Sequence, residues 1–306
     1  MTEADFNQGL PAELVKHVTA MAGDVGTMWL DGLPRTISQL ESEWLITLGN
    51  VFPAGEFNFV AAAVSIDGEP LVVKIAPPFD TNEIRGEAEY LRIRNGRGAV
   101  RLLAENVEQR AILIERAFPG ENLSEHFAGR ESDSIAPAIG VLHAVLGTAP
   151  PASDQVITLD DWFNGLHRYE ESGFAPDYAA KALRIYDRLS AQPRRTYYLH
   201  ADFHPGNIVT ASRAPYLAID PKGIVGHIGY EIAVFLNNFH WWQETKTDVQ
   251  TRLKTAVEQF SDAFDISPHE LREWAYAQMV LGAWWSFDEM PQYYDNAVAK
   301  ADIWNV

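Results

Sequence analysis

The first half of the chain carries hydrophobic patterns that predict β-strands. Aromatic and β-branched residues dominate the segments on both sides of Pro53, and the pair Asp67-Gly68 is a strong signal for a tight hairpin turn. A short apolar strand that contains a single lysine, Lys74, follows this turn. The predicted strands are residues 44–52, 57–66, 71–75, 99–104 and 110–116.

One amphipathic helix is predicted within this β region. Asp80 and Glu83 have the spacing of a capping box at a helix N-terminus. Three apolar residues at i, i+4 and i+7 form one stripe; they are Ile84, Ala88 and Leu91. At 100° per residue, Glu87 lies about 67° from the centre of that stripe, so its carboxylate is expected near the buried face.

The second half of the chain shows mainly helical periodicity, interrupted by short strands around a turn-rich stretch at residues 201–207. The predicted helices are residues 11–22 near the amino terminus and residues 133–146, 159–171, 176–191, 230–239, 248–264 and 268–287; the short strands are 196–200, 208–210 and 216–219. These patterns predict an α+β, bilobal protein. Its β-rich N-lobe, residues 1–116, holds one helix, and its C-lobe, residues 117–306, is mainly helical.

Composition excludes several classes of protein. The chain has 306 residues, enough for two lobes, and 47% of them are hydrophobic, as in ordinary globular proteins. It has no cysteine, which excludes disulfides, zinc ribbons and thiol chemistry. No apolar run approaches the ~18 residues of a membrane-spanning helix, and the amino terminus lacks the features of a secretory signal. We therefore expect a cytoplasmic protein without a membrane partner.

The charge balance narrows the choice of partners. Lys and Arg number 24 against 42 Asp and Glu, which gives a net charge of −18. Nucleic acids gain affinity from many cationic contacts, so we expect no nucleic-acid partner. An acidic surface attracts cationic small molecules, although the same charge also serves solubility alone.

The most informative segment is His200-Ala-Asp-Phe-His-Pro-Gly-Asn207, which Ile219-Asp-Pro-Lys-Gly223 follows after a hairpin. Phosphoryl transfer needs a carboxylate that orients the attacking hydroxyl and accepts its proton, and oxygen ligands that hold Mg²⁺ on the phosphates. The spacing places Asp202 and Asn207 at the two ends of one loop, and Asp220 at a strand end. A metal held by Asn207 and Asp220 would sit beside Asp202.

These segments resemble the aminoglycoside phosphotransferase superfamily, which has the protein-kinase-like fold. Within it, the sequence is most similar to the aminoglycoside and hydroxyurea resistance kinase branch, whose streptomycin kinases phosphorylate a sugar-ring hydroxyl. The resemblance covers most of the chain from about residue 44 onward. It rests on segments 200–208 (HADFHPGNI), 217–223 (LAIDPKG), 96–103 (GRGAVRLL) and 282–286 (GAWWS).

The resemblance implies that Asp202 is the catalytic base and that Asn207 and Asp220 are the Mg²⁺ ligands. One departure occurs at the metal motif, where Pro221 and Lys222 replace the Phe-Gly that follows the metal-binding aspartate of protein kinases. A switch based on that phenylalanine is therefore not expected.

The resemblance also implies the site for ATP. Lys74 matches the third-strand lysine that holds the α- and β-phosphates, and Glu87 matches its helix-borne ion-pair partner. The segment that contains Glu115 and Ala117 matches the interlobe hinge, whose backbone would bind adenine. The phosphate-covering loop departs from the kinase pattern, because Gly49 and Gly55 are six residues apart with a proline between them.

Several of these residues also have simpler interpretations. Lone lysines in apolar strands are often edge residues, and Asp and Asn often form turns. The i, i+4 spacing of His200 and His204 mimics a zinc pair, but such a pair needs a helix and Pro205-Gly206 favours a loop. His200 is therefore expected to support the loop by hydrogen bonds, and His204 to be structural or to touch the acceptor. Trp241-Trp242 and Trp284-Trp285 are expected in the core, with stacking on a sugar as the alternative.

The first hypothesis for function is an ATP- and Mg²⁺-dependent kinase that acts on a hydroxyl of an aminoglycoside or amino sugar. The alternatives are a metabolic kinase for another polar alcohol or amino sugar and a nucleotide-binding pseudokinase that regulates a partner. The intact kinase residues argue against the pseudokinase. Carboxylates that are candidates for binding a cationic acceptor are Asp160, Asp161, Glu170, Glu171, Glu244, Asp288 and Glu289.

Overall fold

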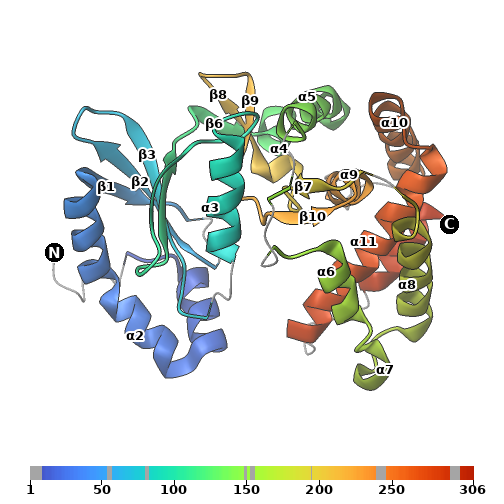
Figure 1. The fold of residues 1–306 in the computed structure, drawn as a ribbon, viewed down its shortest axis with the longest axis horizontal. Helices are drawn as coiled ribbons and strands as arrows, with labels where there is room; N and C mark the ends of the chain where they lie inside the picture. Colours follow the sequence, from blue (N-terminus) through green and yellow to red (C-terminus); the bar gives the residue numbers. More distant parts are fainter. Residues whose placement is uncertain are drawn as a thin grey trace. The chain divides into compact units, whose positions relative to one another are not determined.

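The structure is a computed structural model that describes residues 9–53, 57–79, 83–147, 150–151, 156–193, 195–238, 246–289 and 297–306. The chain divides into two compact units, Met1–Gly120 (unit 1) and Glu121–Val306 (unit 2). Figure 1 shows the strands of unit 1 and the mainly helical unit 2. The two units are described separately below.

Unit 1 is built on a five-stranded antiparallel sheet with the strand order β1-β2-β3-β5-β4 (Figure 1). Its strands are β1 (Ile46–Val51), β2 (Phe59–Ser65), β3 (Pro70–Ile75), β4 (Leu102–Asn106) and β5 (Ala111–Glu115). Gly68 in the β2–β3 turn has a φ of 84°, a conformation that glycine adopts without steric cost. All five strands that were predicted for this region are present in the sheet, although β4 begins at Leu102 rather than at residue 99.

A long helix, α2 (Ala12–Trp44), precedes the sheet and is interrupted at Gly23, where φ is 53° and ψ is −128°. Helical segments were predicted within residues 1–30, including 11–22, and the helix extends beyond them to Trp44. The helix resumes beyond the interruption because apolar residues continue at helical spacing up to Leu40. The buried residues of α2 are Leu14, Val18, Gly26, Leu30, Leu33, Ile37 and Leu40.

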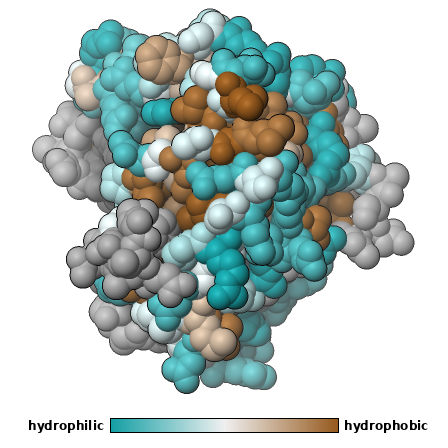
Figure 2. Space-filling model, turned by 90° about the vertical axis from the view of Figure 1, so that its left-hand side faces the viewer, coloured by the Kyte–Doolittle hydropathy of each residue, from teal (hydrophilic) through white to brown (hydrophobic). Residues whose placement is uncertain are grey.

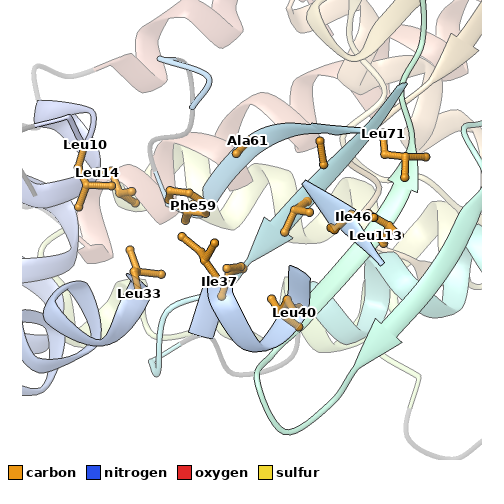
Figure 3. Close-up of a cluster of buried hydrophobic side chains, with 14 of the residues drawn as sticks. Leu10, Leu14, Leu33, Ile37, Leu40, Ile46, Phe59, Ala61, Leu71 and Leu113 are labelled. Atoms are coloured by element: carbon orange, nitrogen blue, oxygen red, sulfur yellow. The ribbon is translucent and has the colours of Figure 1, made fainter. Parts of the chain in front are cut away.

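The hydrophobic core of unit 1 lies between α2 and the sheet. Figure 3 shows Leu14 and Ile37 of the helix gathered around Phe59 of β2. Ile46, Leu71 and the fully buried Phe59 belong to the same cluster. Both halves of α2 thus stabilise the sheet by burying apolar surface, which contributes about 1.5–3 kcal/mol for each fully buried large side chain.

Helix α3 (Glu83–Arg94) is the one helix predicted within the β region. Ile84, Ala88 and Leu91 are buried as expected, and Glu87 is buried with them. The predicted capping residue Asp80 lies outside the described residues. The prediction that the Glu87 carboxylate lies near the buried face is confirmed.

Unit 2 combines helices with two small sheets. Its α-helices are α4 (Leu123–His126), α5 (Ile135–Val145), α6 (Leu159–Leu166), α7 (Tyr169–Ser172), α8 (Pro176–Ser190), α9 (Ile228–Asn237), α10 (Lys246–Phe264) and α11 (Pro268–Glu289). Strand β7 (Tyr197–Leu199) pairs with β10 (Ile224–Gly226), and β8 (Ile208–Ala211) lies between β6 (Pro119–Asn122) and β9 (Tyr216–Ala218). Three 3₁₀ segments complete the list: η1 (Glu131–Ser134), η2 (Pro205–Asn207) and η4 (Ala297–Trp304).

Most predicted helices of unit 2 are confirmed, and one is wrong. The single helix predicted for residues 159–171 is two short helices, α6 and α7. The break follows Gly165, a residue with low helix propensity, and His167 closes α6 by a backbone bond to Asn164. The sequence patterns did not predict β6, β10, α4 or η4, which are each short.

Helix α9 forms the centre of unit 2. Every residue of α9 is buried, as expected for a helix that is apolar on nearly all sides. The Asn237 amide near its end donates to the Ala275 carbonyl of α11 at 2.8 Å and accepts from the Trp304 indole at 2.9 Å. This buried network joins α9, α11 and η4. In the described part of the chain, no helix combines the length and apolar character that a bilayer span requires.

The surface of unit 1 also carries apolar side chains. Figure 2 shows a group of hydrophobic residues on the face that it views. The most exposed large apolar side chains of unit 1 include Met28 at 73% near the interruption in α2 and Ile66 at 79% in the β2–β3 turn. Unit 1 therefore buries one face of α2 and the sheet and leaves part of its apolar content in contact with solvent.

We predict that Gly26→Ala destabilises the protein by about 1–3 kcal/mol. A Cβ at position 26 would lie 2.4 Å from the Val18 carbonyl oxygen, because the two halves of α2 approach closely there. Gly32→Ala in the same helix is the matched control, since its Cβ meets nothing within 4 Å. This control should be stabilising by about 0.5–1 kcal/mol. Urea unfolding of both variants checks the prediction, and equal free energies of unfolding would contradict it.

Candidate functional site

The loop from His200 to Asn207 joins β7 to β8 and brings two predicted site residues together. Ala201 has a φ of 64°, a left-handed conformation that turns the chain sharply after β7. The Asn207 amide nitrogen donates to the Asp202 carbonyl at 3.0 Å and to its carboxylate at 3.1 Å. Asp202 and Asn207 are therefore held against each other within one loop.

The segment that follows β9 carries Asp220 and is hydrogen-bonded to the first loop. The Ile219 N–H donates to the Asn207 carbonyl at 2.9 Å, and the Lys222 N–H donates to the His200 carbonyl at 2.8 Å. Asp220 lies between these two bonds and has a φ of 62°. The three predicted residues Asp202, Asn207 and Asp220 thus belong to one connected structure.

His200 supports both loops. Its side chain is completely buried, its Nε2 lies 2.8 Å from the Ile219 carbonyl, and its Nδ1 accepts from the Asp202 N–H at 3.3 Å. Burial lowers the pKa of His200 to about 3, so the imidazole is neutral and can donate at Nε2 while it accepts at Nδ1. The expectation that His200 supports the loop by hydrogen bonds is confirmed.

His204 shapes the end of the same loop. Its Nδ1 accepts from the Gly206 N–H at 3.0 Å, and its Nε2 lies 3.6 Å from the Asp202 carboxylate. The described residues contain no cluster of three His, Asp or Glu side chains that could hold a metal. The bond to Gly206 agrees with a structural role for His204, and its contact with the acceptor stays a prediction.

The Asp202 side chain is half-buried, with 34% of its surface exposed. Burial raises the pKa of Asp202 and the charge of Asp220 adds to this effect, whereas His204, Lys222 and the Asn207 hydrogen bond act in the opposite direction. A carboxylate that reaches solvent and whose pKa is raised by burial can accept a proton from a bound hydroxyl.

Unit 1 holds the predicted pair of Lys74 and Glu87. The Lys74 ammonium lies 2.6 Å from the Glu87 carboxylate, and the two side chains are only 7% and 3% exposed. Lys74 lies on β3, which is flanked by β2 and β5, so it is not an edge lysine. Two charges buried in this way need each other, because either one alone would be costly to desolvate.

The predicted hinge residues lie at the end of β5. The Glu115 N–H donates to the Arg101 carbonyl at 2.9 Å, and the Glu115 carboxylate accepts from the Arg101 N–H at 3.0 Å. Ala117 follows, and its carbonyl oxygen would lie 2.8 Å from a Cβ at Gly120. Gly55 of the phosphate-covering loop lies outside the described residues.

Comparison with known proteins agrees with this geometry. The sequence model of the family described as aminoglycoside/hydroxyurea antibiotic resistance kinase matches residues 44–289. The chain belongs to this family. The prediction of the branch and of a phosphotransferase enzyme is thereby confirmed.

Two curated relatives illustrate the range of this kinase family. The chain is 26% identical to a streptomycin 6-kinase of Streptomyces glaucescens over 92% of the chain and 91% of the relative. It is 28% identical to a hydroxyurea phosphotransferase of Kitasatospora aureofaciens over 75% of the chain and 68% of the relative.

Solved structures share the kinase-like fold at low sequence identity. A choline kinase from Streptococcus pneumoniae is 13% identical with a TM-score of 0.62, covering 88% of this chain and 96% of that one. An aminoglycoside phosphotransferase bound to AMP-PNP and hygromycin B is 15% identical with a TM-score of 0.62, with coverages of 88% and 96%. The predicted α+β, protein-kinase-like fold is confirmed.

One important residue of this kinase was missed by sequence reasoning. The Glu231 carboxylate on α9 is completely buried and accepts from the N–H groups of His200 and Ala201, at 2.6 Å each. It therefore holds the sharp turn at Ala201 that precedes Asp202. The signal that could have found it is a single acidic residue within the apolar run of residues 228–236.

The predicted acceptor carboxylates of the kinase have structural partners where they are described. Asp160 accepts from the Tyr186 hydroxyl, Asp161 caps α6 through Thr158, and Asp288 pairs with Arg168 at 2.6 Å. Tyr169 donates weakly to Glu170 at 3.4 Å, and Glu171 is exposed on α7. Glu244 and the side chain of Glu289 lie outside the described residues.

The tryptophan pairs behave differently from each other. Trp284 is 1% exposed and packs against Phe174, as expected for a core residue. Its neighbour Trp285 is only half-buried and meets Trp162 edge to face. The expectation of a core position therefore holds for Trp284 but not for Trp285, and Trp241-Trp242 lies outside the described residues.

We predict that Glu231→Gln lowers both stability and turnover. A glutamine can accept only one of the two N–H groups, and its own NH₂ would face the other. The loss of a charged acceptor should cost about 1.5–3 kcal/mol and reduce kcat, with little change in the KM for nucleotide. Glu258→Gln, at a carboxylate that is 54% exposed, is the control and should change neither. Wild-type turnover and melting temperature in Glu231→Gln would refute the positioning role.

Proposed function

We propose that this kinase uses ATP and Mg²⁺ to phosphorylate a hydroxyl of an aminoglycoside or amino sugar. The observation that carries the proposal is the hydrogen-bonded pair of Asp202 and Asn207, tied through backbone bonds to the turn that holds Asp220. One carboxylate and two hard oxygen ligands in one connected structure are the groups that phosphoryl transfer requires.

Asp202 acts as the catalytic base in this proposal. Its carboxylate orients the acceptor hydroxyl toward the γ-phosphate and takes the proton as the new O–P bond forms. The Asn207 amide fixes one of its oxygens by the bond at 3.1 Å. The other oxygen, which lies 3.6 Å from His204, faces the acceptor.

Asn207 and Asp220 would bind the Mg²⁺ ion. The Asn207 NH₂ group is used on Asp202, and within the described residues no donor reaches its amide oxygen. An amide oxygen and a carboxylate are the hard ligands that Mg²⁺ prefers. When bound, the ion would neutralise charge on the phosphates of ATP.

Unit 1 supplies the contacts to ATP. Lys74, positioned by Glu87, would hold the α- and β-phosphates, and the backbone of Glu115 and Ala117 would bind adenine. Several proteins of the same fold have been solved with ADP or AMP-PNP, and this supports nucleotide use. A buried lysine that pairs with a carboxylate from a helix is suited to hold a polyphosphate.

The acceptor class follows from the relatives and the charge. Streptomycin and hydroxyurea, named in the relatives' activities, both offer a hydroxyl. The net charge of −18 favours an acceptor that carries ammonium or guanidinium groups over an anionic one. An amino sugar or aminoglycoside combines a hydroxyl with such a cation.

The proposal predicts that Asp202→Asn folds and binds ATP but loses turnover. Removal of a general base typically costs about 10²–10⁴-fold in rate. Phosphate transfer to streptomycin, glucosamine and hydroxyurea should be followed by ATP consumption, and ATP binding by calorimetry. Asp133→Asn, at an aspartate that is 60% exposed, is the matched control. If Asp202→Asn keeps more than about a tenth of the wild-type rate, Asp202 is not the base.

The proposal also predicts dependence on a hard divalent ion. EDTA should abolish phosphate transfer, and excess Mg²⁺ or Mn²⁺ should restore it, because the proposed ligands are oxygens only. Asn207→Ala should raise the Mg²⁺ concentration needed for half-maximal rate while the fold is kept. Restoration by Zn²⁺ but not by Mg²⁺ would show that the ion is held elsewhere.

A further inference from the structure

Three aromatic side chains from separate helices of unit 2 meet in one cluster. Trp162 of α6 lies edge to face with Trp285 of α11, with a distance between ring centroids of 4.9 Å and an interplanar angle of 85°. Trp162 also meets Tyr230 of α9 at 5.9 Å and 63°. We call these three residues the aromatic wall.

One residue of the aromatic wall is completely buried, and the other two are partly exposed to solvent. Tyr230 is completely buried, whereas Trp162 and Trp285 are half-buried and retain surface for another molecule. The adjacent Trp284 has no such surface, being 1% exposed. Tryptophan side chains are rarely covered completely in proteins, so this exposure shows only that the rings of Trp162 and Trp285 are accessible to another molecule.

Tyr230 connects the wall to the proposed catalytic base. Burial raises the pKa of the Tyr230 phenol well above its usual range, and the nearby charge of Asp202 adds to this effect. The hydroxyl faces the Gln278 side chain without reaching normal hydrogen-bond geometry. Tyr230 also precedes Glu231, whose carboxylate accepts from the Ala201 N–H at 2.6 Å, so the buried end of the wall is next to the residue that holds the turn before Asp202.

The carboxylates around the wall are already engaged. Asp160 and Asp161 directly precede Trp162 in the sequence, but Asp160 accepts from the Tyr186 hydroxyl and Asp161 caps α6. Asp288, three residues after Trp285, pairs with Arg168 at 2.6 Å. The carboxylates nearest to the wall in the sequence therefore already have partners, whereas Trp162 and Trp285 keep part of their surface exposed.

We propose that the aromatic wall binds the acceptor and holds its ammonium or guanidinium group against the indole faces of Trp162 and Trp285. Indole rings attract cations through their electron-rich faces, and Trp does so best among the aromatic side chains. The negative charge of the protein favours the same class of ligand. This inference rests on the proposed function, because Asp202 fixes where the acceptor hydroxyl lies.

The test compares a cationic and a neutral acceptor in three variants of the full chain. Streptomycin is the guanidinium-bearing probe, and hydroxyurea is the neutral one. Trp285→Leu removes the aromatic face, and Trp285→Phe restores part of it. Tyr178→Leu is the matched control, because Tyr178 is another half-buried aromatic residue that stacks against α11, on Tyr276 at 6.5 Å. The readouts are KM and kcat for both acceptors and ATP, and streptomycin binding by calorimetry with AMP-PNP present.

We expect Trp285→Leu to raise the KM and the Kd for streptomycin about tenfold, the size of a partly desolvated cation–π contact. The KM for ATP and for hydroxyurea should stay within about twofold. Trp285→Phe should recover most of the affinity, and Tyr178→Leu should match the wild type. Equal losses for both acceptors, or no loss for streptomycin, would overturn the aromatic wall as a cation site.

The outcomes of this experiment distinguish the proposal of the aromatic wall from the proposed function. Phosphorylation of streptomycin that does not depend on Trp285 would leave the kinase function standing and refute the wall. Streptomycin binding that depends on Trp285 without any phosphate transfer would support the wall and refute the function. A wild-type protein that does not bind streptomycin would refute the wall, and one that phosphorylates none of streptomycin, glucosamine and hydroxyurea would refute the function.

Discussion

The two hydrogen bonds that Glu231 accepts from consecutive backbone N–H groups are the interaction on which the proposed phosphotransferase site depends. A carboxylate without exposure to water is costly unless strong donors surround it, and here the donors belong to His200 and Ala201. Ala201 has a φ of 64°, which a residue with a Cβ adopts only when its surroundings hold it there. The orientation of Asp202 follows from that turn, and the Asn207 amide and the Asp220 segment build on it.

Unit 1 also contains charged side chains that are buried. Lys74 of β3 and Glu87 of α3 form an ion pair that is almost fully buried, whereas the alternate β3 residues Leu71, Val73 and Ile75 belong to the apolar core. A buried pair of this kind is rarely more stable than apolar residues of the same volume. The proposed contact of Lys74 with the phosphates of ATP accounts for this pair better than a gain in stability does. Each unit therefore has a charged side chain at a buried position where an apolar side chain would be expected from folding alone.

Local patterns predicted much of this protein, and the failures have identifiable causes. The strands of unit 1 and the pairing of Asp202 with Asn207 were predictable because their signals lie within a few residues of each other. Glu231 was not, because the groups that it holds lie 31 and 30 residues away in the sequence. Trp284 and Trp285 look alike in the sequence, yet a helix turns 100° per residue, so one points into the core while its neighbour does not.

Helix α9 connects the proposed acceptor surface of unit 2 with the loop that carries the proposed base. Tyr230 and Glu231 are adjacent on it, and the first supports the aromatic wall while the second holds the loop of Asp202. Because every residue of this helix is buried, it cannot rotate or slide without opening the core around it. The distance between the proposed acceptor surface and the proposed base is therefore set by one rigid element. Acceptor specificity can then vary through the half-buried residues Trp162 and Trp285 on α6 and α11, while the geometry of the base stays fixed.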